Sequence, residues 1–133
     1  MTASIPAESL PLLESRAVAF VSTIGPRGEP QTTPLWFLWR DGMVRISLVE
    51  GRQKLRNLRR DPRLSVVVVD PADPTRYVEL RGHVDALTPD PELALERAVA
   101  EKYTGRHVDV EPPGTGRFTT SVVVEKVTWQ HGH

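Results

Sequence analysis

The sequence predicts a small, mainly β fold, a largely antiparallel β-barrel with peripheral helices. Short runs of β-branched and apolar residues, separated by turn residues, predict about six strands. Helical periodicity is confined to a few short segments, so most strands should follow one another as antiparallel hairpins. A length of 133 residues fits one domain over residues 1–133, with one core.

The predicted strands are bounded by turn residues. Residues 17–24 are apolar on both faces, and a Gly- and Pro-rich loop follows them. Residues 32–40 suit a pleated surface, and Asp41-Gly42 then supplies a two-residue turn into a strand over 43–49. We therefore expect 32–40 and 43–49 to pair as a hairpin. The remaining strands are expected over 64–70, 77–84 and 118–129.

Helical spacing marks three segments, residues 7–15, 51–60 and 91–103. The middle helix should end at Asp61, because the proline after it disfavours helical geometry at that residue. The last helix should begin behind Asp90 as its N-cap, with the next proline in its first turn.

Composition excludes several classes of function. The chain has 17 basic and 17 acidic residues, and this balance disfavours a general nucleic-acid binder. It has no cysteine, which rules out disulfides, thiolate nucleophiles and zinc held by sulfur. No segment approaches the roughly 18 apolar residues that a membrane span needs, and the first residues do not resemble a signal peptide. We expect a cytoplasmic protein.

Positive charge is concentrated in the segment EGRQKLRNLRRDPR, residues 50–63. Arg52 and Lys54 fall in the first turn of the predicted helix, where backbone N–H groups and the helix dipole favour an anion rather than a cation. A phosphate bound at this turn would explain the pair. The alternatives are a solvated helix face and a nucleic-acid-binding module whose cations follow the phosphate backbone. The six cations are Arg52, Lys54, Arg56, Arg59, Arg60 and Arg63, and Asp61 is the one acidic residue among them.

Other polar and aromatic residues carry weaker signals. Trp36 and Trp39 lie on opposite faces of one predicted strand, so one of them should lie near a surface, by a ligand, a loop or a subunit interface. The histidines have no spacing typical of a metal site, and no nucleophile elbow is present. We expect no metal and assign no catalytic side chain, so any chemistry should come from a cofactor.

The pattern G-R-x-K-x-x-N-L-x-x-D-P-R over residues 51–63, in register with P-x-W-F at 34–37, resembles the pyridoxamine 5′-phosphate oxidase-like split-barrel family. The resemblance runs from about residue 7 to residue 129. More narrowly, the sequence is similar to the flavin and deazaflavin oxidoreductases that use the deazaflavin coenzyme F420. This resemblance implies a six-stranded antiparallel split β-barrel of the FMN-binding type. It also implies a homodimer with two cofactors in clefts between the subunits.

The resemblance also implies a set of cofactor-binding residues. Arg52 and Lys54 would hold the cofactor phosphate, and Asn57 would support the same turn. Tyr77 of the partner subunit, or its neighbour Arg76, would close the cleft. The residues implied to line the ring system are Thr33, Pro34 and Trp36 on one strand, with Ser47 and Leu48 on the next.

The leading hypothesis is an oxidoreductase that passes a hydride from reduced deazaflavin to a small electron-poor acceptor, such as an enone or quinone. A non-catalytic F420-binding or storage protein is one alternative, and an FMN-dependent oxidoreductase of the same fold is another. The charges of Arg56 and Arg59 favour a cofactor with an acidic tail, unless these side chains are simply solvated.

Overall fold

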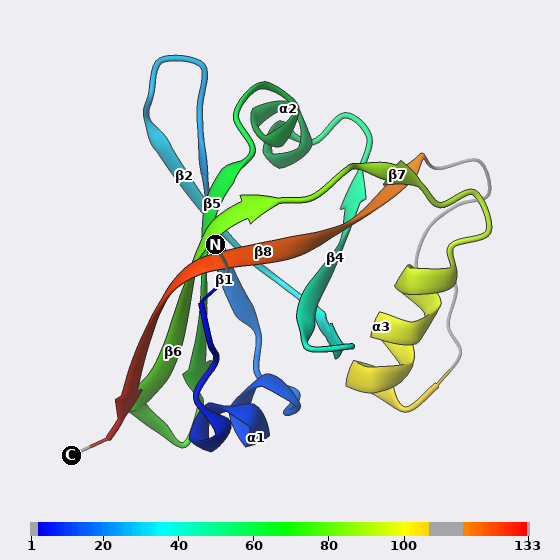
Figure 1. Cartoon of the computed structure of the whole chain (residues 1–133). Coiled ribbons are helices and arrows are strands. Elements are labelled where there is room, and N and C mark those ends of the chain that lie inside the picture. Colours follow the sequence, from blue (N-terminus) through cyan, green and yellow to red (C-terminus); the bar gives the residue numbers. More distant parts are fainter. Residues whose placement is uncertain (1–2, 107–115, 133) are drawn as a thin grey trace.

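The computed structural model describes residues 3–106 and 116–132 as one curled antiparallel sheet with short helices around it (Figure 1). The hydrogen-bonded order of the strands is β2-β1-β5-β6-β8-β4-β3, and β7 pairs with β8. The strands are β1 (Ala19–Ile24), β2 (Pro30–Leu35), β3 (Leu38–Arg40), β4 (Met43–Val49), β5 (Arg63–Asp70), β6 (Asp73–Val84), β7 (Thr88–Pro89) and β8 (Arg117–His131).

β8 is long and, besides the short β7, pairs with two different strands over different parts of its length. Residues 122–131 of β8 pair with β6, and residues 117–121 pair with β4. The register of β6 and β8 shifts after Arg81, at Gly82, where a Cβ atom would overlap the carbonyl oxygen of Val123. β2 and β3 stand at opposite ends of the strand order, yet only two residues separate them along the chain. The sheet therefore curls back on itself, which confirms the predicted mainly β, barrel-like fold class.

The predicted strand over 32–40 is wrong as a single element. It divides into β2 and β3, and β2 pairs with β1 rather than with β4. The break lies at Phe37, whose backbone bonds to side chains instead of a neighbouring strand. Its N–H donates to the Tyr103 hydroxyl at 3.3 Å, and its carbonyl oxygen accepts from Lys102 Nζ at 2.9 Å. The structure describes eight strands instead of six because of this division and the two-residue β7.

The helices are shorter than the sequence predicts. A 3-10 turn, η1 (Ala7–Ser9), leads into α1 (Leu10–Leu13), and α2 covers Gln53–Arg60. The last helix, α3 (Ala94–Thr104), begins three residues later than expected, behind Leu93 in the left-handed conformation at φ 57°. Asp90 still caps this helix, because its carboxylate accepts from the N–H groups of Ala94 and Leu95 at 3.0 and 3.1 Å. The predicted position of Pro91 in the first turn is wrong.

The core fills the inside of the curled sheet, and α1 and α2 close it. Trp39 packs against this core, whereas Trp36, in the break between β2 and β3, remains 41% exposed, so one of the two does lie at a surface. No helix in the described part of the chain is long and apolar enough to cross a membrane. The largest fully buried apolar side chains are Phe37, Leu13, Ile46, Leu55, Leu80, Val21, Val44, Val66, Val68, Val78 and Val122.

Candidate functional site

The turn between β4 and α2 ends in a helix N-terminus that no acidic side chain covers. Gly51 makes the turn at φ 90°, a conformation that side chains with a Cβ atom rarely adopt. Arg52 is the N-cap residue and makes no side-chain capping hydrogen bond. The first turn of α2 contains no Asp or Glu, although the helix dipole favours negative charge at this end.

Most of the clustered cations are engaged elsewhere in the chain. Within residues 3–106 and 116–132, the side chains of Arg52 and Lys54 make no hydrogen bond or ion pair. These two cations are therefore the pair left available to a ligand. Arg56 donates to the Gly51 carbonyl at 2.7 Å, Arg59 makes two bonds of 2.8 Å to Glu50, Arg60 donates to the Ile24 carbonyl at 2.9 Å, and Arg63 pairs with Asp61 at 2.7 Å.

The engagement of Arg56 and Arg59 weakens the argument from an acidic cofactor tail. Arg59 already neutralises Glu50, and hydrogen bonding by Arg59 lowers the pKa of that carboxyl group. Arg56 holds the backbone of the turn and also donates to the Gln53 side chain at 2.7 Å. Neither side chain lines the pocket described below.

Lys54 is half-buried, and its ammonium group is held in an unfavourable environment. Burial lowers the pKa of Lys54, and the positive charge of Arg52 lowers it further. A bound anion would counteract both effects by stabilising the charged form. A buried cation without a partner costs free energy, so its presence here is more easily explained by binding than by stability.

A pocket of about 520 Å³ opens beside this turn, within the size range of ligand sites. It lies between the start of α2, strands β2 and β4, and the first residue of β8. The predicted site residues that the pocket brings together are Thr33, Pro34, Ser47, Leu48, Arg52 and Lys54.

One wall of the pocket holds an unsatisfied hydroxyl group. Thr33 Oγ1 is buried and has no hydrogen-bond partner in the part of the chain that the structure describes. Buried polar atoms are nearly always paired in native proteins, so such an atom needs an explanation. Because Thr33 itself lines the pocket, a ligand group that reached this oxygen would give it a partner.

Asn57 lies beneath the pocket rather than in its wall. Its side chain is fully buried and donates to Thr23 Oγ1 at 3.0 Å and to Gln31 Oε1 at 3.1 Å. It also accepts from Gln53 Nε2 at 2.7 Å. Because Gln31 and Gln53 both line the pocket, Asn57 positions two of its walls and ties α2 to the sheet.

Two further predicted site residues lie outside this pocket. Trp36 lines an adjoining cavity of about 220 Å³ and stacks on Tyr103, with ring centroids 4.8 Å apart and planes 4° from parallel. Tyr77 lies on β6, between Val69 on β5 and Gln130 on β8, and does not line the pocket of the same chain.

Sequence reasoning missed three polar residues of the pocket. Gln31 lies two positions before Thr33 on β2, so strand periodicity could have found it. Gln53 lies in the same helical turn as Lys54. Arg117 carried no signal, because its position depends on how β8 pairs with β4, from which it is far removed along the chain.

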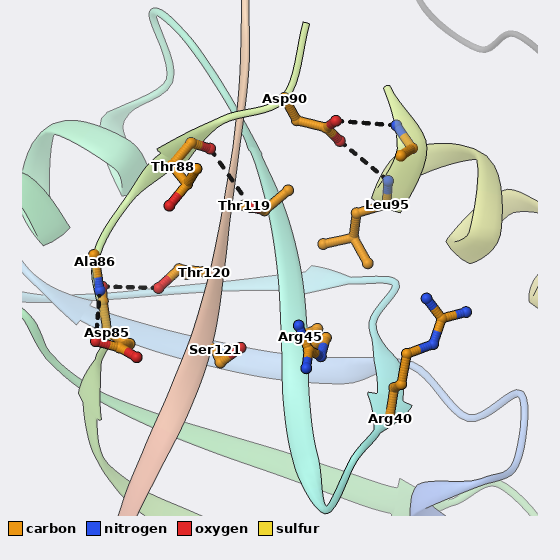
Figure 2. Close-up of a pocket in the computed structure, with 11 residues that line it drawn as sticks. Arg40, Arg45, Asp85, Ala86, Thr88, Asp90, Leu95, Thr119, Thr120 and Ser121 are labelled. Carbon is orange, nitrogen blue, oxygen red and sulfur yellow. Dashed lines mark hydrogen bonds between the residues drawn. The ribbon is translucent and has the colours of Figure 1, made fainter. Parts of the chain in front are cut away.

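A second pocket, of about 420 Å³, lies farther along the outer face of β4 and β8 (Figure 2). Arg40 and Arg45 reach it from one side, but Asp85 and Asp90 line it too, so its charges offset one another. It contains none of the predicted site residues. We therefore place the candidate cofactor site at the α2 turn. Among the described residues, no group of three or more His, Cys, Asp or Glu could hold a metal ion.

A family model described as pyridoxamine 5′-phosphate oxidase matches residues 5–131. The chain belongs to the pyridoxamine 5′-phosphate oxidase family. A solved structure of an F420 reductase is 30% identical to this family member, with a TM-score of 0.86, and the match covers 93% of this chain and 98% of the other.

Two further solved structures extend the comparison. A conserved hypothetical protein from Mycobacterium tuberculosis is 28% identical, with a TM-score of 0.79, over 98% of this chain and 87% of that one. A heme binding protein from Mycobacterium smegmatis is 24% identical, with a TM-score of 0.67, over 98% of this chain and 57% of the other. The last likeness is one of fold.

Proposed function

We propose that this protein is an F420-dependent oxidoreductase, which transfers a hydride from reduced deazaflavin to a small electron-poor acceptor of the enone or quinone type. The observation that carries the proposal is the cation pair Arg52 and Lys54, which lacks a protein partner at the mouth of a pocket in the described chain. The likeness to an F420 reductase over nearly the whole of both chains supports the choice of coenzyme.

The pocket fits a phosphorylated ring system. Arg52, Lys54 and the N–H groups at the start of α2 would hold the phosphate, as helix N-termini commonly do. The buried hydroxyl group of Thr33 would bond to a polar edge of the ring. Asn57 would keep the turn in place from below. Pro34, Ser47 and Leu48 would line the ring, with Trp36 at its far side.

The protein would act mainly by orientation. The coenzyme, when bound, supplies the hydride, and the chain needs to hold ring and acceptor in contact while excluding water. Orientation of this kind contributes about 7 to 11 kcal/mol in favourable cases. A proton from solvent completes the reduction, so no side chain is assigned as a catalytic acid.

We further propose a homodimer with a cofactor cleft at each subunit boundary. The pocket of one chain is open at its mouth, and Tyr77 of the partner subunit would close it. Phe20 and Trp36 are 42% and 41% exposed, large values for aromatic side chains of this size. Phe20 lies opposite Pro34 in the pairing of β1 and β2, next to the pocket, where a partner subunit could cover it.

Two alternatives use the same site. FMN carries the same kind of phosphate and a similar tricycle, and the family includes flavin enzymes. A storage protein would bind F420 without turning over a substrate. Haem is less suited to this pocket, because neither His83 nor His131, the histidines of the described chain, lines it.

The test is to mix the purified protein with reduced F420 and a panel of enones and quinones, and to follow oxidation of the coenzyme. We expect acceptor-dependent oxidation that exceeds the rate without protein. Binding without oxidation would favour storage and remove the enzymatic proposal. Parallel titrations with F420 and FMN identify the cofactor, and a thousandfold preference would correspond to about 4 kcal/mol.

A further inference from the structure

A smaller cavity of about 220 Å³ adjoins the candidate cofactor pocket, and the two share Ser47 and Arg117. β2 forms one side of the cavity and α3 forms the other. A molecule in this cavity would therefore meet a cofactor in the larger pocket at the position of these two side chains. The residues that line the cavity are Leu35, Trp36, Ser47, Glu96, Val99, Ala100 and Arg117.

The aromatic wall of this cavity is held by α3. Trp36 stacks on Tyr103, and the Tyr103 hydroxyl donates to the carbonyl oxygen of Ala17 at 2.9 Å. Lys102, the neighbour of Tyr103, donates to the carbonyl oxygen of Phe37 at 2.9 Å, directly after Trp36. The indole ring is thus fixed from one face although 41% of the residue is exposed. A fixed aromatic wall suits a flat ligand.

The polar end of the cavity is built around a buried ion pair. The side chains of Arg117 and Glu96 are only 11% and 7% exposed, and Arg117 Nη2 lies 3.3 Å from Glu96 Oε1. Arg117 Nη1 donates to Ser47 Oγ at 3.0 Å. The carboxylate of Glu96 therefore fixes the guanidinium group that contacts Ser47.

The bond from Arg117 leaves the proton of the Ser47 hydroxyl group available for donation. An arginine side chain has donors only, so Ser47 must accept in its bond with Arg117, and its own proton remains for another acceptor. Within the described residues, Ser47 has no other side-chain hydrogen bond. Donation from a charged group also polarises the hydroxyl group and strengthens it as a donor. Since Ser47 lines both cavities, its proton is available at their junction.

The volume of the smaller cavity is sufficient for a small ring compound. An apolar cavity of about 150 Å³ is large enough to bind benzene. A cavity of about 220 Å³ therefore accommodates one six-membered ring with small substituents. Leu35, Val99 and Ala100 provide the apolar contacts for such a ring, and Ser47 provides one hydrogen bond at its edge.

We infer that this cavity is the acceptor subsite, and that it takes a single-ring α,β-unsaturated carbonyl compound whose carbonyl oxygen accepts a hydrogen bond from Ser47. The inference rests on the proposed function. A reduced deazaflavin in the larger pocket would supply the hydride for a new C–H bond at the β-carbon, and it would be oxidised with loss of one proton to solvent. The C=C bond becomes single, its electron pair moves toward the carbonyl oxygen, and water then supplies a proton to the α-carbon. Ser47, with Arg117 behind it, stabilises the negative charge on that oxygen.

Binding is tested without turnover, in protein saturated with oxidised F420. Cyclohex-2-enone is titrated while the methyl resonances of Val99 and Leu35 are followed by NMR. We expect saturable shifts of both residues in the wild-type protein. Ala100→Leu should abolish the shifts by filling the cavity, while the affinity for F420 changes less than twofold. Thermal unfolding of the variant verifies that it is folded.

Turnover at saturating reduced F420 tests the role of Ser47. Ser47→Ala should lower kcat for cyclohex-2-enone by about 100-fold, the usual loss for one donor to a developing oxyanion. Ser121→Ala is the matched control, since Ser121 lies on the same strand pair but lines the other pocket, and it should leave the rate unchanged.

The outcomes separate the two proposals. If F420 binds and is oxidised, but Ala100→Leu and Ser47→Ala behave like the wild type, the acceptor subsite is wrong and the proposed function stands. If the protein does not bind F420, the proposed function and the acceptor role both fail.

Discussion

Replacing Lys54 with alanine tests the phosphate site, and the structure sets the expected size of the effect. Lys54 is half-buried in the pocket wall and has no partner among the described residues. A hydrogen bond between a charged group and a ligand contributes about 1.5 to 3 kcal/mol. The variant should therefore bind F420 roughly 10- to 150-fold more weakly. Isothermal titration calorimetry at fixed ionic strength measures this difference.

The free energy of unfolding of Lys54→Ala should not fall together with its affinity for F420. Burial and the charge of Arg52 lower the pKa of Lys54, so the folded state carries this cation at a cost. Lys54→Ala should leave the free energy of unfolding unchanged or raise it slightly, as chemical denaturation can show. A residue whose removal weakens binding without weakening the fold is a binding residue.

Arg60→Gln is the control for charge alone. It removes one positive charge from the same helix, and Arg60, which donates to the Ile24 carbonyl and weakly to Asn57 Oδ1, does not line the pocket. We expect its affinity for F420 to stay within about twofold, because Arg60 is exposed outside the pocket and salt screens charges in solvent. Wild-type affinity in Lys54→Ala, or equal losses in the two variants, would refute the phosphate site at the α2 turn.

Three further predictions concern stability. Asn57→Ala should lower the free energy of unfolding in urea by about 1 to 3 kcal/mol, because Thr23 and Gln31 lose a buried partner. Gly51→Ala should cost about 1 to 2 kcal/mol in the same assay, because its left-handed conformation is strained for a side chain; no atom of the described residues lies within 4 Å of the added Cβ. Burial lowers the pKa of Lys102 to about 8. The unfolded state then binds more protons between about pH 8 and 10.5, so stability should rise with pH in this window, and Lys102→Met should remove that rise.

The local parts of the site could be predicted from the sequence. Leu55 and Leu58 on one face, followed by Asp61-Pro62, define α2 and its end, and the helix does end at Arg60. The same spacing places Arg52 and Lys54 in one turn. Strand periodicity and the family resemblance also predict that Thr33, Ser47 and Leu48 lie on strands beside the site. In the structure these residues line the same pocket.

Features that depend on distant contacts could not be predicted. The division of the 32–40 segment at Phe37 results from side chains of α3, 65 and 66 residues away along the chain. No local pattern reveals such a contact. The bond between Arg117 and Ser47 likewise depends on the pairing of β8 with β4. The predicted start of α3 is three residues too early. Asp90 caps the helix across a turn that ends in Leu93, whose backbone is in the left-handed conformation.

A crystal structure of the protein with reduced F420 tests the central claim most directly. The proposal predicts the coenzyme phosphate within hydrogen-bonding distance of Lys54 Nζ and the Arg52 guanidinium group, with the ring beside Ser47 in the pocket between β2, β4 and α2. A phosphate bound at any other place on the protein, with Arg52 and Lys54 still without a partner, would contradict it.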